Sequence, residues 1–466
     1  MPASSISPPA IERTPEAPSK AGRHARRRVS WFEPAFPAAE PSTAPAWVIG
    51  VLYPLAFFGL AALALLRQSG VAATNSVWAE DGPIFYQQAR LNGFWHTLTI
   101  PYAGYLELGP RLLVQLTRLA PMADAAAVMA VSGAGLLALI CCYVFHASRG
   151  VLPPVWSRIV LVAVIILLPL ATGEILDNIV NIGWWMFFAA FWALITRPRT
   201  NTDAVLAGLV CLLAIATEPL VALLFPLVIV RVLVVRTDWR QEAPVIGLIV
   251  GLAYQAIGIV KGQGSSFSMS TSHGVVRALG LRVGWGWLSG NDLSNHLIHS
   301  SHAAVWQATG YVVLLAVVGA ALLVRDRATT FFVVIAVSFA IITFVVPVYL
   351  RGVGPNEVGQ PLFVGSRYSA TPVLLLWSAV LAIAVQLSRA SEKALLRFAP
   401  GVVCLLLLVP VWALDFRAAN LRTPGPRWNQ QVSEAVARCQ SHPKAQSVLQ
   451  TSPPGWQVAL PCKDVS

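Results

Sequence analysis

A series of long apolar runs separated by short polar segments constrains the fold of this chain more than any other feature. The runs are continuous rather than alternating, which is typical of membrane-spanning helices and not of barrel strands. Of the 466 residues, 56% are hydrophobic and only 12% are charged, whereas soluble globular proteins carry about 25% charged residues. We therefore expect an all-α polytopic membrane protein.

Eleven apolar segments are predicted to span the membrane. They are residues 46–66, 123–146, 156–172, 183–196, 204–217, 219–235, 243–260, 303–324, 329–350, 370–388 and 400–414. The fifth and sixth are counted separately because one helix through both would extend ~48 Å, beyond a hydrocarbon core of ~30 Å. Glu218 and Pro219 supply the break, with Glu218 as a cap of the second helix. Two spans also keep the arginine-rich loops on one side, which the positive-inside rule assigns to the cytoplasm.

The polar ends of the chain complete this topology. Residues 1–45 are rich in proline, carry a basic cluster at residues 23–28 and are predicted to be a disordered cytoplasmic tail. Residues 46–414 form the transmembrane domain, and residues 415–466 form a small exterior tail. The first apolar run starts too late and is too long for a cleaved signal peptide. The net charge of +12 follows the positive-inside pattern, so it does not indicate a nucleic-acid partner.

The longest exterior loop, residues 68–122, contains two adjacent carboxylates, Glu80 and Asp81, followed by Gly-Pro. This pattern predicts a helix N-cap at Asp81 and a short amphipathic helix over residues 83–95. A second helix is predicted from Gly109–Pro110, with three polar residues on one face: Arg111, Gln115 and Arg118. We expect both helices to lie in the plane of the membrane interface.

Several short motifs lie in the exterior loops and at the helix ends beside them. They are Ala79-Glu80-Asp81-Gly82, Pro101-Tyr102-Ala103-Gly104-Tyr105 with Pro110-Arg111, Asn181-Ile182-Gly183-Trp184 and Gly365-Ser366-Arg367-Tyr368. Together they resemble actinobacterial-type integral membrane glycosyltransferases of the GT-C class, over most of residues 47–414. The resemblance implies a large first outer loop with an acidic motif and two juxtamembrane helices. It also implies transfer of a sugar from a polyprenyl-phosphate donor on the outer membrane face.

The acceptor stays open between a glycan, a lipid and a protein, because the chain lacks the large C-terminal carbohydrate-binding domain that some members of the class carry. The expected location is the cell membrane, with the active site on the exterior face. The partners implied are the lipid-linked donor, the acceptor and the bilayer.

The chemistry of such a transfer needs a base and a phosphate-binding cation. A carboxylate takes the proton of the acceptor hydroxyl. We expect Asp81 or Glu80 in this role, and Asp81 first because amide dipoles at a helix start favour its ionised form. A planar guanidinium suits the leaving phosphate, and the candidates are Arg367, Arg111 and Arg351. The alternatives are a plain helix cap for Asp81 and an interfacial anchor for Arg367.

Further substrate-binding candidates follow the third span. Glu174 and Asp177 are three residues apart, so helical spacing would put them on one face, where they could bind the acceptor or a divalent metal. Asn181, Trp184 and Tyr368 complete the predicted set. The pattern requires no cofactor, and a divalent metal stays open.

The loop 261–302 carries possible metal ligands and a tryptophan pair. The possible ligands are Asp292, His296, His299 and His302. We interpret these four as polar loop residues rather than metal ligands. Trp285 and Trp287 are interpreted as interfacial anchors.

The exterior tail is predicted to fold as a small unit. Trp428–Cys439 reads as a helix, and Ser447–Leu449 and Trp456–Leu460 as strands. Cys439 and Cys462 are the two cysteines outside the predicted spans, and an oxidising exterior permits a disulfide between them.

Two other functions compete with glycosyl transfer: a lipid-linked glycan flippase or transporter, and a non-catalytic membrane protein of envelope assembly. A transporter is expected to show two similar halves with broken helices that meet at the midplane. The sequence shows no internal repeat, and its carboxylates gather in the exterior loops. These observations favour the transferase over the transporter.

Overall fold

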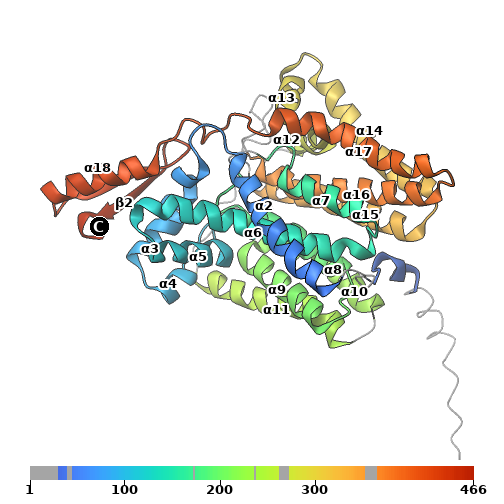
Figure 1. Ribbon diagram of the computed structural model, residues 1–466, viewed down its shortest axis with the longest axis horizontal. Coiled ribbons are helices and arrows are strands. Elements are labelled where there is room, and N and C mark those ends of the chain that lie inside the picture. Colours follow the sequence, from blue (N-terminus) through green and yellow to red (C-terminus); the bar gives the residue numbers. More distant parts are fainter. Residues whose placement is uncertain are drawn as a thin grey trace, which may run out of the picture.

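The computed structural model describes residues 30–38, 45–171, 174–235, 238–261, 272–351 and 365–465. Within these ranges the chain is predominantly helical (Figure 1), as the continuous apolar runs predict. Arg351, one of the three arginines predicted to bind phosphate, is the last residue of its helix, and its side chain lies outside what the structure describes. The predicted disordered tail falls largely outside the described ranges.

A helix coincides with each of the eleven predicted spans. The helices are α2 (Ala46–Leu66), α6 (Ala125–Ala147), α7 (Val155–Ile166), α8 (Ile182–Ile195), α9 (Asn201–Thr217), α10 (Phe225–Val234), α11 (Trp239–Val260), α14 (Ala303–Val324), α15 (Arg327–Arg351), α16 (Arg367–Ala390) and α17 (Ala394–Asp415). In the described ranges, six stretches are long and apolar enough to cross a bilayer, and shorter apolar helices cover the other five segments. The chain is therefore built as a membrane-embedded helical protein, and the number of spans stays a prediction.

The break between the fifth and sixth segments lies where the sequence predicts it. Helix α9 ends at Thr217, Glu218 has extended backbone angles (φ −131°, ψ 104°), and a 3₁₀ turn, η8 (Pro219–Leu224), leads into α10. The Glu218 carboxylate accepts a hydrogen bond from the Leu220 amide at 3.2 Å. The prediction that Glu218 caps the second helix is confirmed.

Two helices occupy the centre of the bundle. Every residue of α8 is buried, and α16 is buried from Tyr368 to Ala379 without interruption. The Thr371 hydroxyl donates a hydrogen bond to the Trp184 carbonyl oxygen at 2.9 Å, which joins the two helices near their N-terminal ends. Helices α9 and α11 pack closely because Gly208 and Gly247 meet there: a Cβ on Gly247 would lie 2.0 Å from the Gly208 carbonyl oxygen.

The first long loop forms several short helices rather than the single helix predicted over residues 83–95. They are the π-turn η4 (Gly82–Tyr86), α3 (Gln87–Leu91), α4 (Phe94–Leu98) and α5 (Leu108–Gln115), followed by the 3₁₀ turn η5 (Leu116–Leu119). The prediction fails at Asn92, which leaves helical angles and whose side chain bonds back to the Gln88 carbonyl oxygen at 2.9 Å. The helix predicted from Gly109–Pro110 is confirmed as α5.

Helix α5 turns its polar face toward the protein. Arg111 and Gln115 are buried, whereas Leu112 of α5 and Leu116 and Leu119 of the following turn η5 are exposed, Leu119 to 85%. A surface helix of a soluble protein has the opposite arrangement. Outward leucines and inward polar groups are what a lipid-facing position favours.

The segment 272–299 is helical, although the sequence analysis treats it as a loop. It contains α12 (Ser272–Ala278), a π-turn η9 (Leu279–Trp285) and α13 (Gly286–His299). The prediction that its tryptophans are interfacial anchors is wrong for Trp287, which is 4% exposed and packs edge-on against Trp377, with ring centroids 5.1 Å apart. The Trp285 indole N–H donates to the Trp306 carbonyl oxygen at 2.8 Å.

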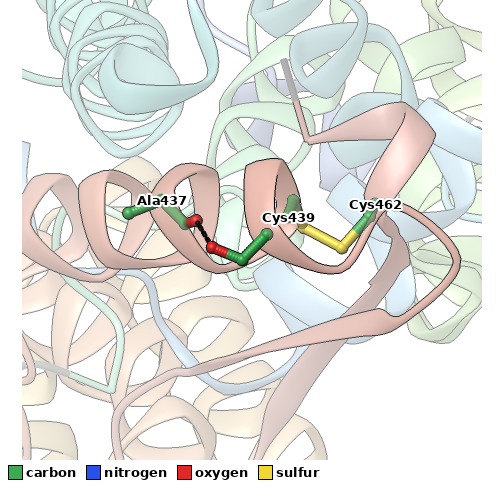
Figure 2. The surroundings of a disulfide bond; sticks show 4 residues. Ala437, Cys439 and Cys462 are labelled. Carbon is green, nitrogen blue, oxygen red and sulfur yellow. Dashed lines mark hydrogen bonds between the residues drawn. A yellow bond between two sulfur atoms is a disulfide. The ribbon is translucent and has the colours of Figure 1, made fainter.

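The C-terminal tail folds as predicted. It consists of α18 (Trp428–Ser441) and an antiparallel hairpin of β1 (Gln446–Gln450) and β2 (Gln457–Pro461). Cys439 and Cys462 form the predicted disulfide, which ties the end of the hairpin to α18 (Figure 2). In Figure 1 the tail lies at the same end of the molecule as α3, α4 and α5, and the described N-terminal segment lies at the other end.

The tail and the first loop share one hydrophobic core. Trp428 packs edge-on against Tyr86 with ring centroids 5.6 Å apart, and its indole N–H donates to the Met122 carbonyl oxygen at 2.9 Å. Ser452 pairs with the strand-like residues before Glu80: its amide donates to Val77 at 2.9 Å and its carbonyl accepts from Ala79 at 2.6 Å. The tail thus supports the loop that carries the two adjacent carboxylates.

Candidate functional site

Asp81 ties the first loop to the segment that follows α7. Its side chain is 2% exposed, and its two oxygens accept hydrogen bonds from the amides of Ile179 (3.1 Å) and Val180 (2.9 Å). The predicted N-cap is wrong, because the carboxylate makes no capping bond to the turn that begins at Gly82. Burial raises the pKa of Asp81 to about 7, although the two amides and Arg422 act to lower it. The carboxylate is therefore used to position the loop.

Glu80 is oriented differently from its neighbour. Its side chain is half-buried, and its Oε2 atom is buried without a hydrogen-bond partner in the described part of the chain. The charge of Glu80 acts on three other site groups: it opposes ionisation of Asp81 and Glu107, and it also acts on Arg367. Glu80 thus acts electrostatically both on groups of the first loop and on Arg367 at the start of α16.

The segment after α7 is fixed by its own asparagines. The Asn181 side chain donates to the Glu174 carbonyl oxygen at 2.6 Å, and the Asn181 amide donates to the side-chain oxygen of Asn178 at 3.1 Å. Asn178 also donates to the Glu174 and Leu176 carbonyl oxygens, at 2.8 and 3.2 Å. Asn181, predicted to bind substrate, is used to hold the backbone of its own loop.

Arg422, from the C-terminal tail, joins the same segment to the start of the first loop. Its guanidinium is 1% exposed and donates to the carbonyl oxygens of Leu176 (3.0 Å), Asp177 (3.2 Å), Ala73 (3.3 Å) and Ser76 (2.9 Å). Arg422 is not predicted from the sequence, because a lone arginine in a polar tail carries no local pattern. We call Asp81, Asn178, Asn181 and Arg422 the anchored cluster.

Arg111 is buried and makes none of these bonds. The residue is 0% exposed, and none of its three guanidinium nitrogens has a hydrogen-bond partner in the described ranges. Its guanidinium carbon lies 5.2 Å from the centroid of the Phe85 ring. Burial lowers its pKa to about 10, with Glu107 acting against this shift, so the side chain stays charged at neutral pH. Burying a guanidinium whose N–H groups make no hydrogen bonds costs free energy. An anionic ligand would supply the missing acceptors.

Glu107 and Gln115 lie one turn before and one turn after Arg111. Glu107 is 4% exposed, and its Oε2 atom lacks a partner among the described residues, as do both side-chain polar atoms of Gln115. Burial and then the charge of Glu218 raise the pKa of Glu107 well above its ordinary value; Glu80 adds to this, and Arg111 and Tyr105 oppose it. We call Glu80, Glu107, Arg111 and Gln115 the unpaired cluster.

Arg367 and Glu174 hold each other at the start of α16. The Arg367 Nη1 atom is 3.2 Å from Glu174 Oε1, and Glu174 Oε2 accepts from the Ser366 hydroxyl at 2.9 Å and from the Arg367 amide at 3.4 Å. The carboxylate therefore sits at the positive N-terminus of the helix. Arg367 also lies over the Tyr368 ring at 5.2 Å, and Tyr368 packs edge-on against Trp184 at 5.4 Å. These four predicted site residues are together, and they contact one another.

Asp177 stands apart from this set. It has a left-handed backbone (φ 53°), is buried, and neither carboxylate oxygen has a hydrogen-bond partner in the part of the chain described. Burial raises its pKa to about 6, against the lowering charges of Arg422 and Arg67. The helical spacing expected for Glu174 and Asp177 is wrong, because the segment is a turn-rich loop.

A metal centre is not formed by the described side chains: no group of three or more His, Cys, Asp or Glu residues occurs among them in a ligating arrangement. In the segment 272–299, His299 directs its Nδ1 atom at the Asn295 carbonyl oxygen at 2.7 Å, and it is exposed. The Asp292 side chain lies outside what the structure describes.

Comparisons with protein families, with curated proteins and with solved structures find no match for this chain.

Proposed function

We propose that the protein is a membrane glycosyltransferase that transfers a sugar from a polyprenyl-phosphate donor to an acceptor hydroxyl. One observation carries the proposal: Arg111 is a fully buried guanidinium whose three nitrogens lack hydrogen-bond partners in the described ranges, and it lies one helical turn from Glu107, whose Oε2 atom also lacks a partner there. A planar cation with free donors is suited to a phosphate. A lipid-linked phosphate would reach it from the bilayer, toward which we orient the exposed leucines Leu112, Leu116 and Leu119 of α5 and η5.

We assign the base to Glu80 rather than to Asp81. Asp81 already accepts two amide hydrogen bonds, whereas Glu80 has a free carboxylate oxygen. In the transfer, Glu80 takes the proton of the acceptor hydroxyl, the hydroxyl oxygen attacks the anomeric carbon, and the bond from that carbon to the phosphate oxygen breaks. Attack from the side opposite the phosphate inverts the configuration. Arg111 binds the phosphate throughout, and the Arg367–Glu174 pair with Tyr368 and Trp184 forms a wall for the sugar or acceptor.

The proposed topology has eleven spans, a cytoplasmic N-terminus and an exterior C-terminus. The arginine distribution along the sequence supports it, and so does the coincidence of a helix with each predicted segment. With this orientation the first loop, the segment after α7 and the tail are all exterior. An oxidising exterior also suits the Cys439–Cys462 disulfide.

The direct test is transfer by the purified protein in liposomes, with radiolabelled polyprenyl-phosphate sugars as donors and cell-envelope glycans as acceptors. The proposal expects a labelled product from at least one donor, with inverted anomeric configuration, and no product from the Arg111→Met variant. Transport of the intact donor across the liposome membrane, without sugar transfer, would support the flippase alternative instead.

A further inference from the structure

Glu107 is a buried carboxylic group that the proposed transfer does not yet use. It immediately precedes α5, and the Arg111 amide donates to its backbone carbonyl oxygen at 3.2 Å, so the two side chains belong to successive turns. The Glu107 carboxylate and the Arg111 guanidinium act on each other electrostatically, yet Glu107 Oε2 and all three guanidinium nitrogens lack hydrogen-bond partners in the described ranges. A ligand that fits between them would satisfy both.

The groups around Glu107 oppose its ionisation on balance. Glu218 faces it from the α9–η8 junction and Glu80 from the first loop, and both carry like charge. Arg111 and the Tyr105 hydroxyl act in the opposite sense. Because burial outweighs these two, the pKa of Glu107 is raised well above its ordinary value, which favours the protonated carboxyl group.

The departing group of the proposed reaction needs such a proton. Cleavage leaves a polyprenyl phosphate with two negative charges in a buried site, and Arg111 supplies only one positive charge. Uncompensated charge in such a site is costly. A proton delivered to a phosphate oxygen leaves a monoanion, which one guanidinium balances.

We propose that Glu107 is the general acid of the transfer and protonates the phosphate held by Arg111 as the glycosidic bond breaks; this role rests on the proposed function. The proton balance closes over one turnover. Glu80 gains the proton of the acceptor hydroxyl, Glu107 loses its proton to the phosphate, and a proton moves from Glu80 to Glu107 before the next cycle. The two carboxylates already influence each other across the site.

The test compares two donors over a range of pH with the protein in liposomes. One donor is a polyprenyl-phosphate sugar; the other carries a nitrophenyl-substituted lipid alcohol, whose phosphate is less basic when it departs. For the wild type, kcat with the first donor should fall at high pH. Glu107→Gln should lower kcat with this donor about 100-fold and change the donor KM less than about twofold. The fall in kcat at high pH should disappear in this variant. With the nitrophenyl donor, the same variant should lose much less of the wild-type kcat. Glu107→Asp retains an acid and should keep part of the rate.

A second variant tests the same role without touching Glu107. Glu218→Gln removes a like charge but keeps the side-chain oxygen that accepts from Leu220. The Glu107 pKa should then fall, and the high-pH fall in kcat should move to lower pH. An unchanged kcat in Glu107→Gln, an equal loss with both donors, or an unmoved pH profile in Glu218→Gln would overturn the proposal while the transferase function stands. If the wild type transfers no sugar from either donor, the proposed function fails and this role fails with it.

Discussion

The anchored and the unpaired clusters contain the same kinds of side chain, and they use them in opposite ways. Arg422 and Arg111 are both fully buried arginines, but Arg422 donates to four backbone carbonyl oxygens, whereas the Arg111 guanidinium donates to none in the described ranges. Asp81 and Glu80 are adjacent, yet Asp81 accepts two amides and Glu80 keeps a free oxygen. Arg422 and Asp81 therefore hold the loops of the site in place, whereas Arg111 and Glu80 are available to a ligand.

Two other buried arginines, Arg231 and Arg67, follow the anchored pattern. Arg231 donates to the carbonyl oxygens of Leu194, Thr196 and Gln241, and Arg67 donates to those of Ile166, Leu168 and Ala171. Bonding to carbonyls at helix ends is how a membrane protein offsets the cost of burying an arginine. Arg111 departs from this pattern, which is why it is the best candidate for a ligand contact.

The largest expected effect separates Glu80 from Asp81. Glu80→Gln should lower sugar transfer by about 10²- to 10⁴-fold, because the general base is lost, with folded protein at the wild-type level. Asp81→Asn replaces one accepting oxygen by a donor facing an amide, so it should lower the yield of folded protein more than the activity of what folds. Transfer rates per folded molecule, measured after size-exclusion chromatography, distinguish the two. A dead Asp81→Asn variant of normal yield, with an active Glu80→Gln variant, would restore Asp81 as the base.

A large effect on stability is expected at Arg422. Arg422→Met leaves several carbonyl oxygens without donors and should cost on the order of 4 kcal/mol. Arg438→Met is the matched control, because Arg438 is an exposed arginine of the same tail and should change stability by about 0.5 kcal/mol or less. Thermal unfolding in detergent measures both. An Arg422→Met protein as stable as the control would show that the anchored cluster does not hold the loops together.

The smallest effect concerns Asp177 and pH. Its folded-state pKa is about 6, above the ordinary value of about 3.9, so the folded state binds the proton more tightly than the unfolded state. Its stabilising contribution is complete below about pH 4 and is lost as pH rises through about 6, by roughly 3 kcal/mol at most. Asp177→Asn, which tolerates the left-handed backbone, should remove this pH dependence and stabilise the protein at pH 7.5. A variant less stable than the wild type at pH 7.5 would indicate an ionic partner.

The sequence predicts the helices well because the feature that determines them is local. Apolar runs, the Glu218–Pro219 break and the cysteine pair of the tail are each visible within short stretches, and the structure contains the corresponding elements. The helices of residues 272–299 are not predicted because they depend on a tertiary contact. Gly284 packs against Gly310 of α14, and a Cβ on Gly284 would lie 2.7 Å from the Gly310 backbone.

The sequence predicts which residues belong to the candidate site better than it predicts what each residue does there. Residue type and position are enough to predict five members of the site: Glu80, Asp81, Arg111, Glu174 and Arg367. Their partners lie far along the chain: Asp81 bonds to Ile179 and Val180, and Glu174 bonds to Ser366 and Arg367. These tertiary contacts decide which carboxylate forms structural hydrogen bonds and which keeps an oxygen free for a ligand. A single sequence does not contain this information. Gln115 was recognised only as part of a polar helix face, and Arg422 not at all.

The central claim is that Arg111 binds the donor phosphate, and the most direct measurement is the affinity of the purified protein for polyprenyl phosphate alone. Arg111→Met should weaken binding about 10- to 100-fold, since charge-assisted hydrogen bonds are lost, and should leave the unfolding temperature unchanged or raised because the Arg111 guanidinium makes no hydrogen bond within the described ranges. Arg118→Met is the control, since its guanidinium bonds to the Ala89 and Asn92 carbonyl oxygens. Undiminished binding in Arg111→Met, or a loss confined to Arg367→Met, would contradict the account.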